Sequence, residues 1–133
     1  MSAYHQKWYR RNKKKCRRLG DAYYKKHKKE RSIYAAANNI DIKLKTLSRY
    51  GFNGKLQCCW PDCRVNDIDM LSLDHIYNNG REDRKNWKSP AGVNFYRRLI
   101  KKGFPEGFQT LCLNHQSKKE LMRRREVRIG ELQ

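Results

Sequence analysis

The sequence predicts a small α+β domain that is closed by a bound metal ion and preceded by basic helices. Apolar residues make up 38% of the 133 residues, too few for a large hydrophobic core, so an additional staple is expected. Two short apolar runs, at residues 70–76 and 108–113, have the length of strands. Cysteine and histidine pairs stand near these runs, in CCWPDC and in LCLNHQ. We therefore expect a basic helical arm over residues 1–40 and a metal-stabilised domain over residues 41–133.

The charge of the chain predicts an anionic partner. The formal net charge is +19 and the pI is about 10.1, which favours nucleic acid, and double-stranded DNA in particular, as the partner. The chain has no long apolar run, so a membrane is disfavoured. The N-terminus is polar and basic without a hydrophobic region, which predicts an intracellular, non-secreted protein of the cytoplasm or nucleoid. Five cysteines, an odd number without a secretory context, favour metal ligands over disulfides.

The arm is nearly all basic, aromatic and polar. WYRRNKKK, from Trp8, is echoed by YYKKHKKE, from Tyr23, and Gly20 lies between them as a break or hinge, so two basic helices are expected. Aromatic rings interleaved with cations suit stacking on bases, whereas a solvated charged arm or a protein-contacting helix is the plainer alternative. The arm residues expected to bind nucleic acid are Arg10, Arg11, Lys13, Lys14, Lys25 and Lys26.

The rest of the chain alternates short helices and strands. An amphipathic helix is expected around residues 41–51, ended by Gly51 and Gly54, and a charged loop over residues 81–90. Apolar residues at helical spacing predict a helix over residues 93–102, which Gly103 and Pro105 stop. The chain is expected to be helical again from His115 onward.

Two ligand pairs predict a four-coordinate zinc site. Cys58 and Cys63 are separated by four residues, and Cys112 and His115 by two, so each turn can present two ligands to one ion. Cys59 is an alternative to Cys58, although Cys58 leaves a better intervening turn. The plainer alternative is buried cysteines beside a surface histidine. One structural zinc per chain is expected.

Asp74 and His75 stand together at the end of the first predicted strand. A carboxylate is a hard oxygen ligand for a divalent cation, and a neutral imidazole can take a proton from water near pH 7. Neighbouring strand residues point to opposite sides, so the two could address one phosphate from two directions. A surface Asp beside a histidine with satisfied hydrogen bonds is the plainer reading of the dipeptide.

The order of these motifs over roughly residues 55–122 resembles the HNH endonucleases of the ββα-metal fold, and most closely the zinc-binding proteins of phages and mobile elements. The resemblance implies that Asp74 binds a catalytic Mg²⁺ or Mn²⁺ and that His75 is the general base. It also implies that the two ligand pairs bind zinc. Gln116 stands where the family has an Asn or His as second ligand of the catalytic metal, and Asn114 is an alternative, although a helix would turn it away from position 116. Gly107 stands where the family has the middle Asn, and Asn94 could substitute only if the inserted segment folds back.

The function expected from this resemblance is a metal-dependent endonuclease, a hydrolase of DNA phosphodiester bonds that uses one catalytic metal ion. One such centre makes one nick, so a homodimer is one way to cut both strands. The alternative is a catalytically weak or inactive, zinc-stabilised nucleic-acid-binding or structural protein. Besides the arm, the residues expected to hold phosphates are Arg84, Arg97, Arg98, Arg123 and Arg124.

Overall fold

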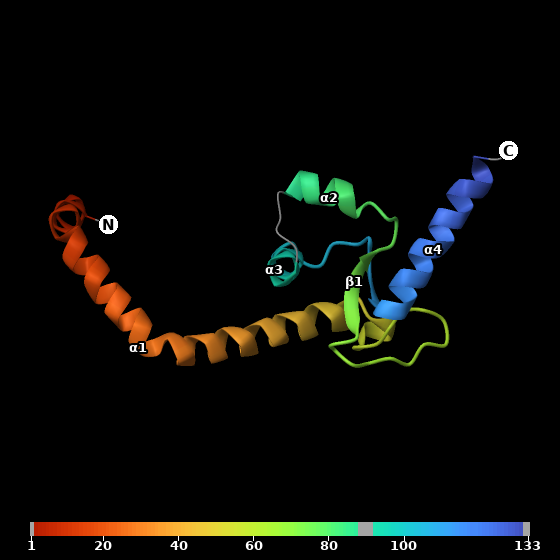
Figure 1. The fold of residues 1–133 in the computed structure, drawn as a ribbon, viewed down its shortest axis with the longest axis horizontal. Coiled ribbons are helices and arrows are strands. Elements are labelled where there is room, and N and C mark those ends of the chain that lie inside the picture. Colours follow the sequence, from red (N-terminus) through yellow and green to blue (C-terminus); the bar gives the residue numbers. More distant parts are fainter. Residues whose placement is uncertain (1, 88–91, 132–133) are drawn as a thin grey trace. The chain divides into compact units, whose positions relative to one another are not determined.

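The fold combines helices with one two-stranded sheet, which confirms the α+β class. The computed structural model describes residues 2–87 and 92–131, without the side chains of Ala3, Arg84 and Trp87. In chain order the elements, drawn in Figure 1, are α1 (Ala3–Arg49), the short 3-10 helix η1 (Phe52–Gly54), β1 (Leu71–His75), α2 (Gly80–Trp87), α3 (Val93–Lys101), β2 (Phe108–Cys112) and α4 (Leu113–Gly130).

Helix α1 differs from the sequence prediction because it is continuous from Ala3 to Arg49. The expected break at Gly20 is absent, and the expected separate helix around residues 41–51 is the last part of α1. A single glycine inside a helix costs only about 1 kcal/mol, which flanking lysines, arginines and alanines offset. The chain divides into two compact units, Met1–Asn38 and Asn39–Gln133, so α1 contributes to both.

The end of α1 begins the core of the second unit. Leu47 is fully buried and clusters with Leu71, Leu111 and the sulfur-bearing residues Cys58 and Cys112. Helix α1 then stops before a tight turn in which only glycine fits, since a Cβ at Gly51 would lie 1.9 Å from the carbonyl oxygen of Lys55. The small core therefore joins α1, the loop after it and both strands.

Strand β2 is tied to the end of α1 by hydrogen bonds. The hydroxyl of Thr110 donates to the carbonyl of Leu47 at 2.8 Å, and its amide donates to the carbonyl of Tyr50 at 2.9 Å. The Thr110 carbonyl in turn accepts from the amide of Cys59 at 2.8 Å. These bonds satisfy buried polar groups of Thr110 and fix the cysteine-bearing loop against the sheet.

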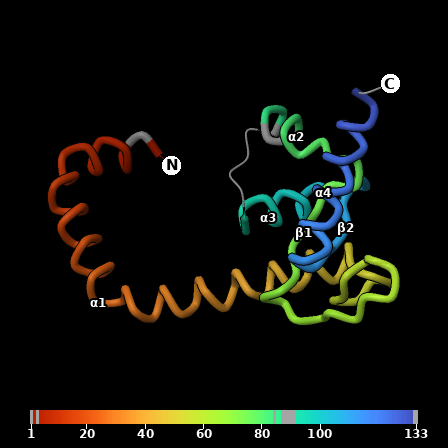
Figure 2. Tube along the Cα trace, turned by 45° about the vertical axis from the view of Figure 1, so that its right-hand side comes forward, coloured from red at the N-terminus to blue at the C-terminus, as the bar shows by residue number. Residues whose placement is uncertain are grey.

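The two strands form an antiparallel pair. Leu71 pairs with Cys112 at one end of the register, and His75 pairs with Phe108 at the other. Helix α4 follows β2 without a loop and contacts both strands, as Figures 1 and 2 show. One end of the sheet, where β2 continues into α4, therefore carries the metal-type ligand Cys112. The other end of the sheet, where β1 ends, carries the Asp74–His75 pair.

The charged segment 81–90, expected to be a loop, is instead helical as far as it is described, and residues 88–91 lie outside the described residues. Helix α2 (Gly80–Trp87) has Glu82 and Asp83 in its first turn, where carboxylates complement the helix dipole. The carbonyl of Asn79 accepts hydrogen bonds from the amides of Glu82 and Asp83 at 3.0 and 3.1 Å. Low apolar content concealed this helix, because α2 is held by its N-terminal turn and not by a broad apolar face.

The other elements match the sequence prediction closely. Helix α3 (Val93–Lys101) ends one residue before the expected position, and β1 and β2 occupy the two apolar runs. Gly103 adopts a positive φ of 73°, and the amide of Phe104 donates to the carbonyl of Leu99 at 2.9 Å. Such a left-handed glycine is typical of a helix C-terminus, so the predicted stop is confirmed.

Candidate metal centre and catalytic pair

The structure gathers all four predicted metal ligands. The ligand atoms of Cys58, Cys63, Cys112 and His115 lie within 4.8 Å of one another, and we call these residues the Cys₃His cluster. Nδ1 of His115 lies 3.1 Å from the sulfur of Cys112 and 3.6 Å from that of Cys58. Among the described residues, no other group of three or more His, Cys, Asp and Glu side chains converges in this way.

The dimensions of the Cys₃His cluster fit a tetrahedral metal ion. Zinc bonds of about 2.3 Å to sulfur and about 2.0 Å to nitrogen place neighbouring ligand atoms roughly 3.5–3.8 Å apart. The two sulfur–nitrogen distances, 3.1 and 3.6 Å, are close to that separation. Three thiols and one imidazole are also the donor set that structural zinc prefers, so the cluster can hold a metal ion such as zinc.

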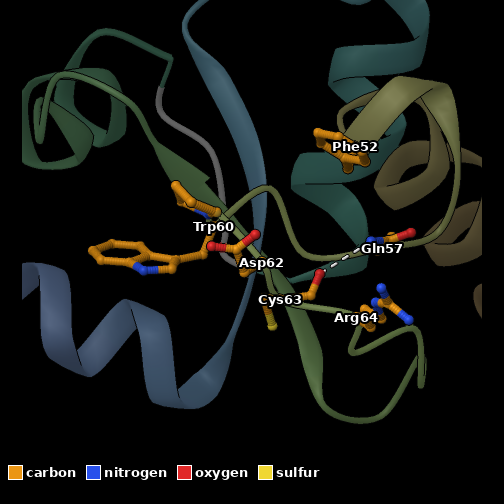
Figure 3. A pocket seen from close by; sticks show the side chains of 7 residues that line it. Phe52, Gln57, Trp60, Asp62, Cys63 and Arg64 are labelled. Atoms are coloured by element: carbon orange, nitrogen blue, oxygen red, sulfur yellow. Dashed lines mark hydrogen bonds between the residues drawn. The ribbon is translucent and has the colours of Figure 1, made fainter.

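A tight turn presents the first two ligands. The amide of Cys63 donates to the carbonyl of Trp60 at 3.1 Å, which closes the turn, and the amide of Cys58 donates to the carbonyl of Val65 at 2.9 Å. The side chain of Gln57 donates to the carbonyl of Cys63 at 3.0 Å, as Figure 3 shows. The same close-up shows the pocket beside this turn, lined by Phe52, Gln57, Trp60, Pro61, Asp62, Cys63 and Arg64.

The choice between Cys58 and Cys59, which the sequence left open, is decided by the direction of the side chains. The sulfur of Cys58 is fully buried and belongs to the cluster. The thiol of Cys59 instead donates to the carbonyl of Tyr50 at 3.2 Å, so it faces the end of α1. Cys16 lies in the first unit and is not a member of the cluster.

The surroundings of two cysteines affect their acidity in opposite directions. Burial raises the pKa of Cys58 to about 11. Burial also acts to raise the pKa of Cys112, but hydrogen bonds from the amide of His115 and from the Cys58 and Cys63 side chains outweigh it and lower that pKa. Amides at the start of a helix favour a thiolate, so Cys112, immediately before α4, is well placed to be a metal ligand.

An aromatic stack fixes the fourth ligand. The rings of Trp60 and His115 are parallel to within 5°, with centroids 4.8 Å apart. On the Trp60 ring also lies the ammonium of Lys118, 5.3 Å from the centroid. Trp60 therefore belongs to the turn between the cysteines and at the same time orients the imidazole from α4.

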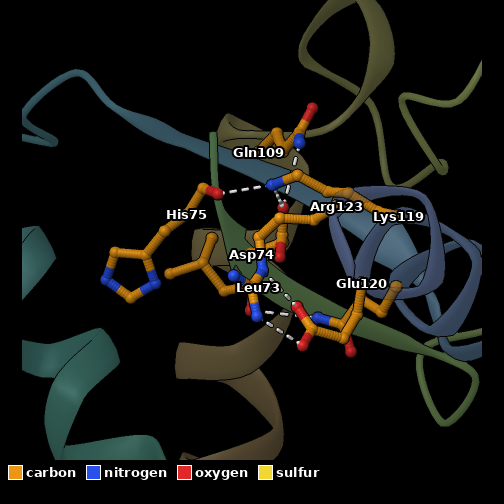
Figure 4. Close-up of polar contacts among 8 residues, drawn as sticks. Leu73, Asp74, His75, Gln109, Lys119, Glu120 and Arg123 are labelled. Atoms are coloured by element: carbon orange, nitrogen blue, oxygen red, sulfur yellow. Dashed lines mark hydrogen bonds and ion pairs between the residues drawn. The ribbon is translucent and has the colours of Figure 1, made fainter. Parts of the chain in front are cut away.

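Asp74 lies on the side of β1 that faces α4, and one oxygen of its carboxylate, Oδ2, has two partners within the protein. Its Oδ2 accepts hydrogen bonds from Gln109 at 2.9 Å and from the ammonium of Lys119 at 2.5 Å. The same ammonium donates to the carbonyl of His75 at 2.5 Å, as Figure 4 shows. The side chains of Asp74 and Lys119 are only 18% and 17% exposed. This carboxylate thus already holds a positive charge.

His75 points away from the Asp74 carboxylate, as neighbouring residues of a strand do (Figure 4). Its ring packs against Phe108 and Phe95, with centroids 4.9 and 6.0 Å away. Its Nε2 lies 3.2 Å from Oδ2 of Asp83 in α2, but the angles do not make a hydrogen bond, and this nitrogen is shielded from solvent. Gly80 fits closely on the other side, since a Cβ there would lie 3.0 Å from Nδ1. The imidazole is therefore enclosed by the start of α2.

The residues at the other positions of the family pattern make contacts with the backbone or lie exposed. The amide of Gln116 donates to the carbonyl of Leu73 at 3.2 Å, beside Asp74 but bonded to the strand backbone. The carbonyl of Gly107 accepts from the amide of Ile76 at 3.0 Å, which extends the strand pairing by one bond. Asn114 is exposed.

The sequence analysis did not predict three residues that contact Asp74 or His75, namely Asp83, Gln109 and Lys119. Pairing of the two apolar runs would have placed Gln109 opposite Asp74, once the register was known. Lys119 lies one helical turn after His115, so helical spacing puts it on the same side of α4. Asp83 carried no usable signal, because its segment was expected to be a loop.

A cleft borders the end of β1, with a volume of about 400 Å³. Tyr77 is 77% exposed in it, and the guanidinium of Arg49 lies 5.9 Å from the centre of the Phe104 ring. The cleft is lined by Arg49, Tyr50, Ile76, Tyr77, Phe104, Glu106, Gly107 and Phe108. It therefore brings aromatic rings and a cation next to the Asp74–His75 pair.

The residues expected to bind phosphate fall into two groups. The six cations of the arm are exposed. In the second unit Arg97 donates to Asn94 and Asn39, at 3.0 and 2.9 Å. Arg123 and Arg124 both donate to Glu120 at 2.8 Å. Arg98 also has a partner, and the side chain of Arg84 lies outside the described ones. The arm thus presents the more accessible positive charge.

Hydrogen bonds from Arg123 and Arg124 lower the pKa of Glu120 to about 2. Glu120 therefore stays ionised at any pH near neutral, and it cancels part of the positive charge at that point of α4.

Comparison of the chain with protein-family models, with curated proteins and with solved structures found no match. Among the described helices, none has the length and apolar character needed to cross a membrane.

Proposed function

We propose that this chain is an endonuclease that hydrolyses phosphodiester bonds in DNA, with His75 as general base and Asp74 as ligand of a divalent cation. The observation that carries the proposal is the place of the Asp74–His75 pair. It ends a strand whose antiparallel partner runs directly into the Cys₃His cluster and α4. The resemblance of the sequence motifs to HNH endonucleases is the second support for the proposal.

The chemistry assigned to His75 is proton abstraction. A neutral imidazole can take a proton from a water molecule near pH 7, and that water can then attack the phosphorus in line with the leaving 3′ oxygen. Because Nε2 is covered by Asp83, the start of α2 has to move for water to reach this nitrogen. Loops and short helices that open or close over an active site are common in enzymes.

Asp74 would hold Mg²⁺ or Mn²⁺, which would supply positive charge to the phosphate in the transition state. The fit is supported by the ammonium of Lys119, which stands in for a cation on Oδ2 of this carboxylate. The Cys₃His cluster has a separate role in this proposal. It would bind one structural zinc ion, which would hold the small core together.

Charge supports DNA as the substrate. The arm, residues 1–40, has 13 Lys and Arg residues against 2 Asp and Glu residues. Its net charge is therefore +11, out of +19 for the whole chain. Exposed tyrosines and a tryptophan lie among these cations and can stack on bases or sugars. Binding should therefore weaken steeply with salt, because each neutralised phosphate releases counterions.

The test is a nicking assay on supercoiled plasmid with the zinc-loaded protein and Mg²⁺ or Mn²⁺. We expect nicks with wild type and a loss of at least about 100-fold in rate for His75→Ala, the usual scale of general-base catalysis. DNA affinity of His75→Ala should stay at the wild-type value. Equal nicking by His75→Ala, or no nicking with any divalent ion, would reject the assignment. Linear product that forms without a nicked intermediate would indicate paired chains, since one centre cuts one strand.

A second candidate is a zinc-stabilised nucleic-acid-binding protein without catalysis. The contacts of Asp74 and His75 favour this second candidate. Lys119 neutralises the carboxylate of Asp74, and α2 covers the Nε2 of His75. This candidate predicts salt-sensitive DNA or RNA binding with no strand scission under any divalent ion. Stronger binding to RNA than to DNA would favour a structural role in a ribonucleoprotein.

A further inference from the structure

We infer that Lys119 competes with the divalent cation for Asp74, so that the catalytic metal binds only when this lysine leaves the carboxylate. The inference rests on the proposed function in one respect, the choice of Asp74 as the ligand of a metal ion. It assigns to Lys119 a role in controlling metal occupancy, and the family pattern described above does not include this residue.

Lys119 differs from an ordinary surface lysine, because its side chain is largely buried and its ammonium has two acceptors within the protein. Its ammonium reaches two acceptors, the Oδ2 of Asp74 and the carbonyl of His75, so it bridges the two residues of the catalytic pair. The side chain is 17% exposed, although lysines are among the most exposed residues of proteins. Position 119 on α4 therefore directs a cation to the end of β1.

One oxygen of the Asp74 carboxylate is already occupied while Lys119 is bound. Oδ2 of Asp74 also accepts a hydrogen bond from Gln109 at 2.9 Å, so two donors already share this oxygen. A divalent cation on the same carboxylate would lie within a few ångströms of the ammonium. Like charges at that distance repel strongly where water is largely excluded, so the lysine and the metal ion exclude each other.

If the metal ion has to displace Lys119, bound DNA should increase the affinity of the protein for the metal ion. Once released, the ammonium loses both of its acceptors and needs another anionic partner. A phosphate of a bound strand near the end of β1 supplies one, because ammonium groups bind phosphate oxygens as point charges. Metal affinity should then be low in the free protein and higher in the DNA complex.

The experiment measures Mn²⁺ binding to the zinc-loaded, full-length chain without DNA, by electron paramagnetic resonance. In Lys119→Met, which removes the ammonium and retains an unbranched apolar side chain, we expect Mn²⁺ to bind at least about tenfold more tightly than in wild type. Arg128→Met, which removes an exposed cation elsewhere on α4, is the matched control and should leave the affinity unchanged. The double variant Asp74→Asn with Lys119→Met should lose the gain, which locates the ion on Asp74.

Lys119→Gln serves as a second variant, because a neutral amide can still donate to a carbonyl and so preserve the fold. Zinc content and thermal unfolding are measured for every variant. If both folded variants bind Mn²⁺ no more tightly than wild type, the inference is wrong. A plasmid assay without nicks, together with the expected gain in Mn²⁺ affinity, would reject the nuclease and leave the competition at Asp74 intact.

Discussion

The Cys₃His cluster and the Asp74–His75 pair lie at opposite ends of one small sheet and are built in opposite ways. In the cluster the ligand atoms of four side chains, from the cysteine turn, β2 and α4, converge within 4.8 Å. At the other end the two side chains diverge, and each faces a charged partner inside the protein, Lys119 for Asp74 and Asp83 for His75.

The two sites differ in how many ligand atoms converge. The Cys₃His cluster has four, whereas at the other end a single carboxylate is paired with a lysine. Three thiols and one imidazole that converge on one point could hold a metal ion such as zinc, and a structural zinc ion contributes to folding free energy. A carboxylate paired with a lysine is stable without a metal, and it can exchange that lysine for another cation. In our proposal, the two ends of the sheet therefore combine a structural metal site with a site whose metal ion can be exchanged.

The largest expected effect is the loss of a cluster ligand. Cys112→Ser should release the metal and unfold the second unit, because a structural zinc supplies on the order of 10 kcal/mol of folding free energy. Zinc content by elemental analysis and the far-ultraviolet circular dichroism melt measure both effects. Cys59→Ser is the matched control, since its thiol faces the Tyr50 carbonyl, and it should retain one metal ion per chain. Equal metal loss in both variants would contradict the assigned ligand set.

The next effect is that of pH on the metal. Protons compete with the metal for each thiolate, so affinity should fall by about tenfold per pH unit for every ligand that takes up a proton. The pKa of Cys112 is lowered in the fold, so the stability that its thiolate contributes is present above the ordinary pKa of 9 and is lost as pH falls through the lowered value. A zinc-sensitive dye should therefore report release on acidification, and release only on the alkaline side would contradict this sign.

The smallest effect concerns the contact between His75, at the end of β1, and Asp83 of α2. Asp83→Ala should lower the free energy of unfolding by about 1 kcal/mol, the usual cost of a single substitution, because it removes the carboxylate that lies 3.2 Å from the buried Nε2 of His75. Zinc content should not change, which separates this end of the sheet from the cluster. Glu82→Ala, at the exposed neighbouring position, is the control. In a double-mutant cycle, Asp83→Ala and His75→Ala should show coupling, and additive losses would mean that the two residues do not interact.

Much of the second unit could be predicted because its patterns are local. The apolar runs 70–76 and 108–113 have strand length, and both are strands. The left-handed Gly103 ended α3 as predicted. The arm and α2 were mispredicted for the same reason, since a breaker residue or a charged composition is a weak signal against helix propensity. Gly20 is tolerated within α1, and the charges of the segment after Gly80 suit the first turn of a helix.

What the sequence by itself determined is the inventory: two ligand pairs, one Asp–His pair at a strand end, and a charge of +19 concentrated in the arm. Only the tertiary structure decided which side chains meet. It turned Cys59 away from the cluster, brought Lys119 onto Asp74 and enclosed His75 with α2. The physical reason is that spacing along the chain fixes which residues share a turn or a face. Partners supplied by distant segments depend on strand register and on the packing of α2 and α4.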